Sequence, residues 1–171
     1  IAWVSWRNQL NFVRVCDYIA VCVPFGMLFG RLANFVNGEL WGRVAGEGAA
    51  WAMVFPDAPD ALPRHPSQLY EAVAEGLLMA AILWPPFWKT DARYKPGFLF
   101  GMAALIYGIS RFLIEFVREP DAHLRNVVEQ TGLSMGQWLT VPMILVGLYL
   151  VATAAKRRQR VEPVAGSASV A

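Results

Sequence analysis

The feature that most constrains this fold is a run of 26 residues, Gln130 to Ala155, that contains no charged side chain. About 20 predominantly apolar residues suffice for a helix to cross a lipid bilayer, so this run predicts a membrane-spanning helix. The composition agrees, because 56% of the residues are hydrophobic and 16% are charged, whereas soluble domains carry about a quarter charged residues. A disordered chain is excluded, and a net charge of +2 gives no reason to expect a nucleic-acid partner.

Three further apolar segments are long enough to cross a bilayer, although each contains charged residues. We therefore predict an all-α integral membrane protein with about four transmembrane helices, at about 15–37, 67–88, 97–117 and 135–155. Outer loops at 38–66 and 118–134 and a basic, flexible cytoplasmic tail at 156–171 complete the prediction. Glycines spaced four apart predict close helix packing, and they occur at positions 26/30, 97/101 and 132/136.

The basic residues indicate the orientation, because cytoplasmic loops of membrane proteins collect Lys and Arg. With a cytoplasmic C-terminus, nine basic residues lie on the inner side, namely Arg7, Arg14, Lys89, Arg93, Lys95, Lys156, Arg157, Arg158 and Arg160. Only four lie on the outer side, namely Arg43, Arg64, Arg118 and Arg125. Both termini are therefore expected in the cytoplasm.

Two arginines remain inside the predicted spans, at nearly the same depth. Arg31 lies about 16 residues along one outward-running helix and Arg111 about 14 residues along another, so both fall in the outer part of the membrane. A guanidinium group presents a planar set of donors that matches a phosphate group, and it stays charged in a low dielectric. With Asn34 and Tyr107 as further hydrogen-bonding groups, the pattern predicts a headgroup site for an anionic phospholipid.

Purely structural explanations of these residues stay open. Arg31 followed by Gly38 is also typical of a helix end, and a His-Pro pair at 65–66 is typical of a helix start. The charged side chains within and at the end of the predicted spans could simply neutralise one another. These side chains are Glu71, Glu75, Arg111, Glu115 and, at the outer end, Arg118.

An anion transporter or channel, or a non-catalytic membrane protein that binds anionic lipid, would use intramembrane arginines as well. The cytoplasmic halves of the predicted spans hold few polar residues beyond Asp17, which argues against a pore. The two cysteines, Cys16 and Cys22, are about 9 Å apart along one expected helix, too far for a disulfide, and they do not form a metal site.

Four sequence blocks resemble, in the same order, the motifs of the bacterial phosphatidylglycerol:prolipoprotein diacylglyceryl transferases. The blocks are GRLANFVNGELWGR at 30–43, RHPSQLYE at 64–71, YGISRFLIEFVREPD at 107–121 and LSMGQWLTVPMI at 133–144. The first matches the family signature Gly-Arg-x-x-Asn-Phe-x-Asn-x-Glu-x-x-Gly. The resemblance covers nearly the whole chain before the tail at Lys156.

The resemblance implies an enzyme of the bacterial cytoplasmic (inner) membrane that needs no cofactor or metal. It would transfer the diacylglyceryl group of phosphatidylglycerol to the lipobox cysteine thiol in a prolipoprotein signal peptide, releasing glycerol phosphate. The residues that it places in phosphatidylglycerol binding are Arg31, Asn34, Glu39, Gly42 and Arg111. Those that it places in catalysis are Arg31, Arg111, Tyr107 and His65.

The resemblance also implies roles for these side chains. Arg31 and Arg111 are expected to hold the phosphate group and to take up its developing charge. Asn34 would orient the headgroup, and Tyr107 would donate to it or position the thiol. The outer loop at 43–64 could shape the approach of the acceptor peptide, or it could be only an ordered connection lying on the headgroups.

The general base is the part of the expected site that this sequence does not supply. The family carries an essential histidine in a His-Gly-Gly block, whereas His65 and His123 are the only histidines here and neither has glycine neighbours. The family usually has seven spans, so we expect this chain to hold the last four, beginning inside a longer protein. The base is then expected upstream of Ile1, or else in His65, and the chain alone is not expected to hold a complete site.

Overall fold

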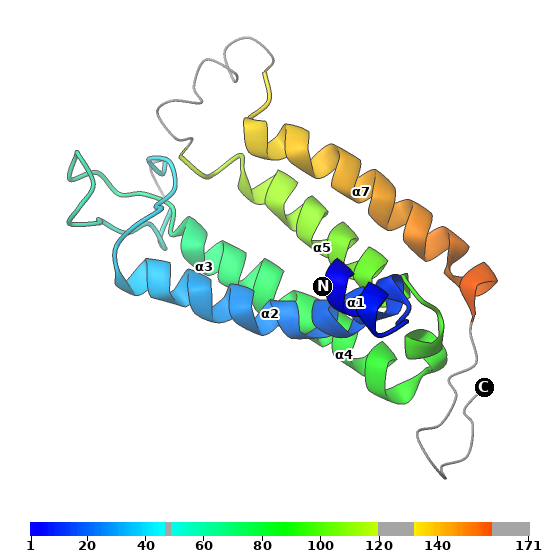
Figure 1. The fold of residues 1–171 in the computed structure, drawn as a ribbon. Helices are drawn as coiled ribbons and strands as arrows, with labels where there is room; N and C mark the ends of the chain where they lie inside the picture. Colours follow the sequence, from blue (N-terminus) through cyan, green and yellow to red (C-terminus); the bar gives the residue numbers. More distant parts are fainter. Residues whose placement is uncertain (47–48, 120–131, 159–171) are drawn as a thin grey trace.

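The computed structural model describes residues 1–46, 49–119 and 132–158. Within these ranges the regular structure is helical, with isolated β-bridges and no strand (Figure 1). The expected all-α architecture is therefore confirmed for the described residues. In chain order the elements are α1 (Ala2–Arg7), α2 (Phe12–Val36), α3 (Ser67–Glu71), the π-helix η1 (Ala72–Leu78), α4 (Met79–Lys89), the 3₁₀ turn η2 (Asp91–Tyr94), α5 (Phe98–Ile114), α7 (Met135–Thr153) and the 3₁₀ turn η4 (Ala154–Arg157).

The long helices form a bundle with α5 at its centre. Helix α5 contacts α7 on one side, and on the other it contacts α2 and the continuous helical run α3–η1–α4. Figure 1 shows the connections after α2 and after α5 at one end of the bundle, and the start of α2 together with η2 at the opposite end. The arrangement places the C-terminal parts of α2 and α5 beside the beginning of α3.

Two helices among the described residues are long and apolar enough to cross a membrane. They are Phe12–Val36, with a mean hydropathy of 1.7, and Met135–Arg157, with a mean hydropathy of 1.9, while Phe98–Ile114 is apolar but shorter. Large apolar side chains such as Phe29 and Leu139 are 65% and 66% exposed, as expected of surfaces that lipid covers. That four segments cross, with both termini inside, stays a prediction. His123, Arg125 and the tail from 159 onward lie outside the described residues.

One intramembrane carboxylate has a structural explanation. Asp17 of α2 is 1% exposed, and its two oxygens accept hydrogen bonds of 2.7 Å from the backbone N–H groups of Gly97 and Phe100. These N–H groups lie at the start of α5, where a helix has no partner of its own for them. Asp17 therefore caps α5 across the bundle, which explains a charge in the N-terminal half of α2.

Glycines allow close helix approaches, but not all of those expected. A Cβ atom on Gly101 would lie 3.0 Å from the carbonyl oxygen of Gly147, so these two glycines let α5 and α7 meet backbone to backbone. No described atom lies within 4 Å of such a Cβ on Gly26 or Gly30, so the close packing expected at this pair involves no described helix and stays a prediction. Both glycines lie on the exposed side of α2. Helical spacing alone does not show which side of a helix packs against its neighbours.

Candidate functional site

The predicted arginines meet around one buried carboxylate. The Nε of Arg31 lies 3.1 Å from Oε2 of Glu71, and the Nη1 of Arg111 lies 2.5 Å from its Oε1. The Nη2 of Arg31 is also 3.5 Å from Oε2 of Glu75. Two side chains from α2 and α5 thus share a partner on α3, which confirms that Arg31 and Arg111 lie at one level of the bundle.

We call Arg31, Glu71, Glu75 and Arg111 the charge cluster. Glu71 and Glu75 are 0% exposed, whereas the arginine side chains are 17% and 13% exposed. Two positive and two negative charges cancel, which is what low-dielectric surroundings require of buried ions. The charges therefore neutralise one another, as one of the structural explanations supposed. The arginines of the charge cluster remain partly exposed, so a ligand could reach them.

A charge ladder on α5 extends the cluster outward. The Nη2 of Arg111 lies 3.3 Å from Oε2 of Glu115, and the Nη1 of Arg118 lies 3.9 Å from the same oxygen. The neutralisation that was left open for Arg111, Glu115 and Arg118 therefore occurs, although the contact of Arg118 is long. Because Arg111 also binds Glu71, the ladder does not account for all of its contacts.

The π-helix η1 and one glycine bring the two glutamates to the arginines. A Cβ atom on Gly76 would lie 2.8 Å from the Cβ of Leu28, so only glycine permits η1 to approach α2 this closely. Leu28 is one turn before Arg31, and Gly76 follows Glu75 directly. π-Helical turns are rare and frequently lie at functional sites. Gly76 was not predicted from the sequence, although its place directly after the intramembrane carboxylate of Glu75 was a usable signal.

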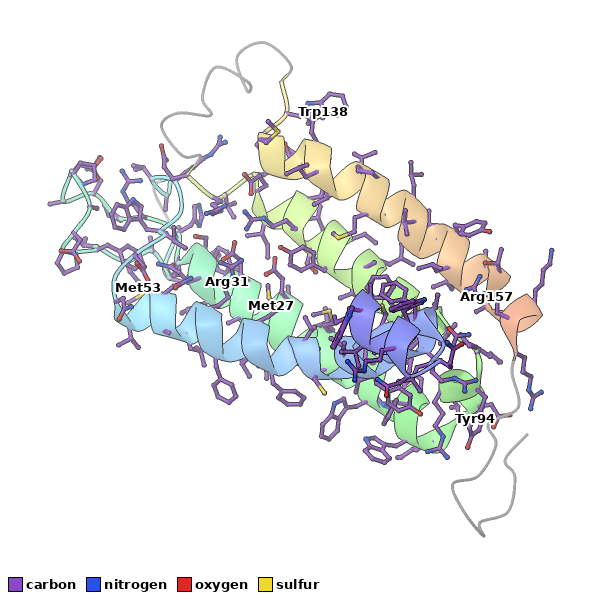
Figure 2. The ribbon with its side chains drawn as sticks, in the orientation of Figure 1. Met27, Arg31, Met53, Tyr94, Trp138 and Arg157 are labelled. Atoms are coloured by element: carbon purple, nitrogen blue, oxygen red, sulfur yellow. The ribbon has the colours of Figure 1, made fainter. Side chains whose placement is uncertain are left out.

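An apolar groove begins one helical turn inward from the charge cluster. Met27, Met79 and Tyr107 line its outer end, and they lie four residues from Arg31, Glu75 and Arg111 respectively, on the same helix faces. The groove has a volume of about 640 Å³ and continues along α2, α5 and α7 past Ala103, Val146 and Cys16. Figure 2 shows Met27 and Arg31 next to one another on α2. With cations near one end and an apolar lining along its length, the groove suits an amphiphile that has an anionic head.

The loop between α2 and α3 is tied down by its backbone and by two polar side chains. The N–H of Gly42 donates to the carbonyl of His65 at 2.9 Å, and the N–H of Arg43 donates to that of Val117 at 2.8 Å. A Cβ on Gly42 would lie 2.6 Å from the Val117 oxygen, so this signature glycine permits a backbone crossing. Ser67 and Gln68 fasten the loop to α3 by donating to the carbonyls of Leu40 and Glu39.

The other predicted residues lie around this loop. Glu39 is exposed and accepts a hydrogen bond of 3.3 Å from Asn37. His65 is half-buried, with its Nδ1 3.1 Å from the hydroxyl of Tyr70. Asn34 is half-buried, one turn beyond Arg31. The structure therefore groups Arg31, Arg111 and the nearby Tyr107, whereas within the described residues no ion pair or hydrogen bond joins Glu39, Gly42 or His65 to the charge cluster.

Arg64 is a loop residue whose role the sequence did not suggest. Its side chain is 6% exposed, and it donates to both oxygens of Asp60, at 3.1 and 3.0 Å, and to the carbonyl of Gly42 at 3.1 Å. These hydrogen bonds hold the pKa of the Asp60 carboxyl below its usual range. The backbone of Arg64 pairs with Met53 in both directions. Arg64 is thus the centre of the loop, and a basic residue counted only for orientation proves to be structural.

Known proteins match the same arrangement of motifs. A family model described as prolipoprotein diacylglyceryl transferase matches residues 1–153. Proteins named phosphatidylglycerol–prolipoprotein diacylglyceryl transferase are similar to the chain in Erythrobacter litoralis, with 57% identity over 163 residues, and in Zymomonas mobilis, with 52% over 157 residues. The alignments cover 95% and 92% of this chain but 57% and 53% of those proteins.

A more distant relative of the same name, from Bradyrhizobium diazoefficiens, is 44% identical over 157 residues, with 92% of this chain and 55% of that protein covered. The chain spans about half the length of the curated relatives that it matches. The family model extends over α1 to α7 and includes every residue of the charge cluster. The chain belongs to the prolipoprotein diacylglyceryl transferase family.

Proposed function

We propose that the full-length protein transfers the diacylglyceryl group of phosphatidylglycerol to the lipobox cysteine thiol of a prolipoprotein and releases glycerol phosphate. The observation that carries this proposal is the place of the charge cluster, one helical turn beyond the end of an apolar groove. An anionic diacyl lipid needs both parts, because its phosphate requires cations and its acyl chains require apolar surroundings. Membership of the family supports the reaction.

The reaction needs a group that accepts negative charge. The thiolate sulfur attacks the carbon of the diacylglyceryl group that carries the phosphate, and a C–S bond forms. The bond between that carbon and the phosphate oxygen breaks, and its electron pair stays on the oxygen of the released glycerol phosphate. Arg31 and Arg111 are the groups for this charge, since a guanidinium keeps its proton and offers several donors in one plane. Tyr107, at the junction of cluster and groove, is placed for donation to an ester or phosphate oxygen.

The remaining assignments are parts of the same proposal. The protein would lie in the bacterial cytoplasmic membrane with four spans in this chain, both termini inside, and the charge cluster toward the outer leaflet. The excess of basic residues at the η2 and η4 end of the bundle supports that orientation. Asn34, Glu39 and Gly42 would shape the lipid site. The thiol proton would go to a base on another part of the full-length protein or to His65, whose ring meets Tyr70.

The test is diacylglyceryl transfer to a lipobox peptide by the purified full-length protein in micelles that contain phosphatidylglycerol. Arg31→Lys and Arg111→Lys keep the charge that Glu71 needs but remove the planar set of donors. We expect each to lower the rate roughly a hundredfold or more, the usual loss when a donor to a developing anion is removed. Thioether product by mass spectrometry and released glycerol phosphate are measured together.

Arg158→Lys is the matched control, because Arg158 is 51% exposed and pairs at 3.4 Å with the exposed Asp91 at the far end of the bundle. It should transfer at the wild-type rate. Near-normal turnover of both Arg31→Lys and Arg111→Lys would contradict the proposal. Anion flux through liposomes that hold the protein, without thiol-dependent transfer, would contradict it as well and would indicate a transporter.

A further inference from the structure

Glu75 is the least compensated member of the charge cluster. It is 0% exposed, and neither of its carboxylate oxygens accepts a well-oriented hydrogen bond from a described residue. Its ion contact is the 3.5 Å approach of Arg31 to one oxygen. Glu71, in contrast, has a guanidinium group on each oxygen, at 3.1 and 2.5 Å. The two glutamates share the arginines unequally.

The charge balance changes when an anion enters. The cluster is neutral with two arginines and two ionised glutamates, so a phosphodiester brings it to a net charge of −1. An uncompensated charge in a low-dielectric site costs several kcal/mol, and a carboxylate beside another anion takes up a proton instead. The carboxylate with the fewest partners is the one to do so.

We propose that binding of the anionic phosphate of a phospholipid is coupled to protonation of Glu75, so that the site binds one lipid anion and one proton together. This rests on the function proposed above. The proton converts Glu75 from a competitor for Arg31 into a neutral group that can donate to a phosphate oxygen. Arg31 then keeps its Nε contact with Glu71 and can offer the Nη2 group that faced Glu75 to the phosphate, while Glu71 also keeps Arg111 in place.

The groups around Glu75 favour this assignment. Arg31 faces it from α2, Glu71 from α3, and Tyr107 and Arg111 from α5, while Met79 follows it on α4 at the groove. Glu71 is held by both cations and would give up two ion contacts on protonation, whereas Glu75 gives up one. Tyr107 carries no charge when protonated and cannot offset the added anion.

The experiment is calorimetric titration of the full-length protein with dihexanoyl phosphatidylglycerol in buffers of different ionisation enthalpy, which yields the protons taken up per lipid bound. We expect close to one proton per lipid at pH 8 for the wild type. Affinity should then fall with rising pH by up to about tenfold per unit, as linkage to one proton requires. Dihexanoyl phosphatidylcholine, which has no net charge, should bind without proton uptake, and inorganic phosphate separates headgroup binding from lipid binding.

Glu75→Gln copies the neutral acid, so this variant should bind phosphatidylglycerol without proton uptake and with an affinity independent of pH. Asp91→Asn, at an exposed carboxylate, should behave as the wild type. Binding by the wild type without proton uptake overturns this inference but leaves the proposed function standing, whereas failure to bind phosphatidylglycerol at all contradicts the proposed function. Proton uptake that is lost in Glu71→Gln and kept in Glu75→Gln also overturns it. If Glu75→Gln does not fold, the infrared band of a protonated carboxylic acid, appearing in the wild type on lipid binding, decides the question.

Discussion

Three largely covered arginines of the described residues each contact more than one acceptor through the guanidinium group. Arg31 contacts two glutamates, Arg111 contacts Glu71 and Glu115, and Arg64 contacts Asp60 and a backbone carbonyl. Lysine has one small ammonium group and cannot serve acceptors on separate elements in this way. Replacement of arginine by lysine therefore tests the geometry of these contacts, since the charge is kept and only the arrangement of the donors changes.

Arg64→Lys should loosen the loop between α2 and α3 without unfolding the bundle. The paired hydrogen bonds to Asp60 and the contact with the Gly42 carbonyl cannot all be made by one ammonium group. The Gly42 carbonyl is buried, and a buried acceptor left without a partner costs about 1–3 kcal/mol. Hydrogen exchange of the Met53 and Arg64 amides, which pair with one another, should accelerate by one to two orders of magnitude, by that arithmetic.

The exposed Arg158→Lys should leave the exchange of the same amides unchanged. Wild-type protection in Arg64→Lys would show that the loop does not depend on the Arg64 side chain.

The pH dependence of amide protection in the loop tests the same interaction independently. Arg64 lowers the pKa of Asp60, so the stabilisation is complete above the ordinary value of 3.8 and is lost as the pH falls through the lower folded value. Loop amides should therefore lose protection below about pH 4, and Asp60→Asn should show the loss already at neutral pH.

At the scale of elements, the site depends on how closely η1 approaches α2. Gly76 lies against the Cβ of Leu28, and its own helix has π geometry over Ala72–Leu78. The approach carries Glu75 to Arg31, which belongs to the other element. The geometry of the charge cluster is thus set by a packing contact next to Glu75 and one turn before Arg31.

Gly76→Ala should lower both stability and transfer activity. The added Cβ would lie 2.8 Å from the Leu28 side chain and 3.0 Å from its Cα, so the two elements must separate. Overpacking of this kind costs typically about 1–3 kcal/mol. Thermal unfolding in detergent reports the stability, and transfer to a lipobox peptide reports the separation of Glu75 from Arg31.

Gly26→Ala is the matched control on α2, because no described atom lies within 4 Å of the position of its Cβ. It should be neutral, or more stable by up to about 1 kcal/mol since alanine is the better helix former. A variant Gly76→Ala with wild-type stability and activity would refute the close-approach explanation. Similar losses in both variants would show that the effect comes from glycine flexibility and not from packing.

Over the whole molecule, the groove and the charge cluster lie one helical turn apart. Side chains from α2, α4, α5 and α7 line the groove, and Met27, Met79 and Tyr107 in its lining lie four residues from members of the charge cluster. Val146 on α7 borders the groove yet is 51% exposed, while Leu148 on the same helix is 52% exposed and is not part of the lining. These two positions allow bulk to be added inside and outside the groove without changing the core.

Val146→Trp should reduce transfer from dipalmitoyl phosphatidylglycerol more than transfer from the dihexanoyl lipid. The indole would occupy space that a long acyl chain needs, at an expected cost of about 1–3 kcal/mol, or roughly 5- to 150-fold in rate. The ratio of the two rates is measured for the wild type and for the variant. Leu148→Trp should keep the wild-type ratio, and an unchanged ratio in Val146→Trp would place the acyl chains elsewhere.

Much of the candidate site was predictable because it depends on local sequence patterns, namely hydropathy and helical spacing. The uncharged run from Gln130 to Ala155 indicates a membrane helix, and helical spacing alone puts Tyr107 and Arg111 on one face. The depth of Arg31 follows from counting residues along its span. Spacing did not show that Gly26 has no neighbour among the described helices, because periodicity gives a helix a face but does not identify the neighbour of that face.

The class of the fold, the family motifs and the level of the two arginines could be predicted from local patterns, since hydropathy and helical period act over about 20 residues or fewer. The packing of the helices was needed to show that Glu71 is shared by both arginines, that Glu75 is left with one long contact, and that Asp17 caps α5. Arg111 and Glu71 are 40 residues apart in the chain, and Asp17 and Gly97 are 80 apart. Partners at such separations are chosen by the packing of whole helices, because a buried charge must be neutralised by whichever opposite charge the packing brings within reach.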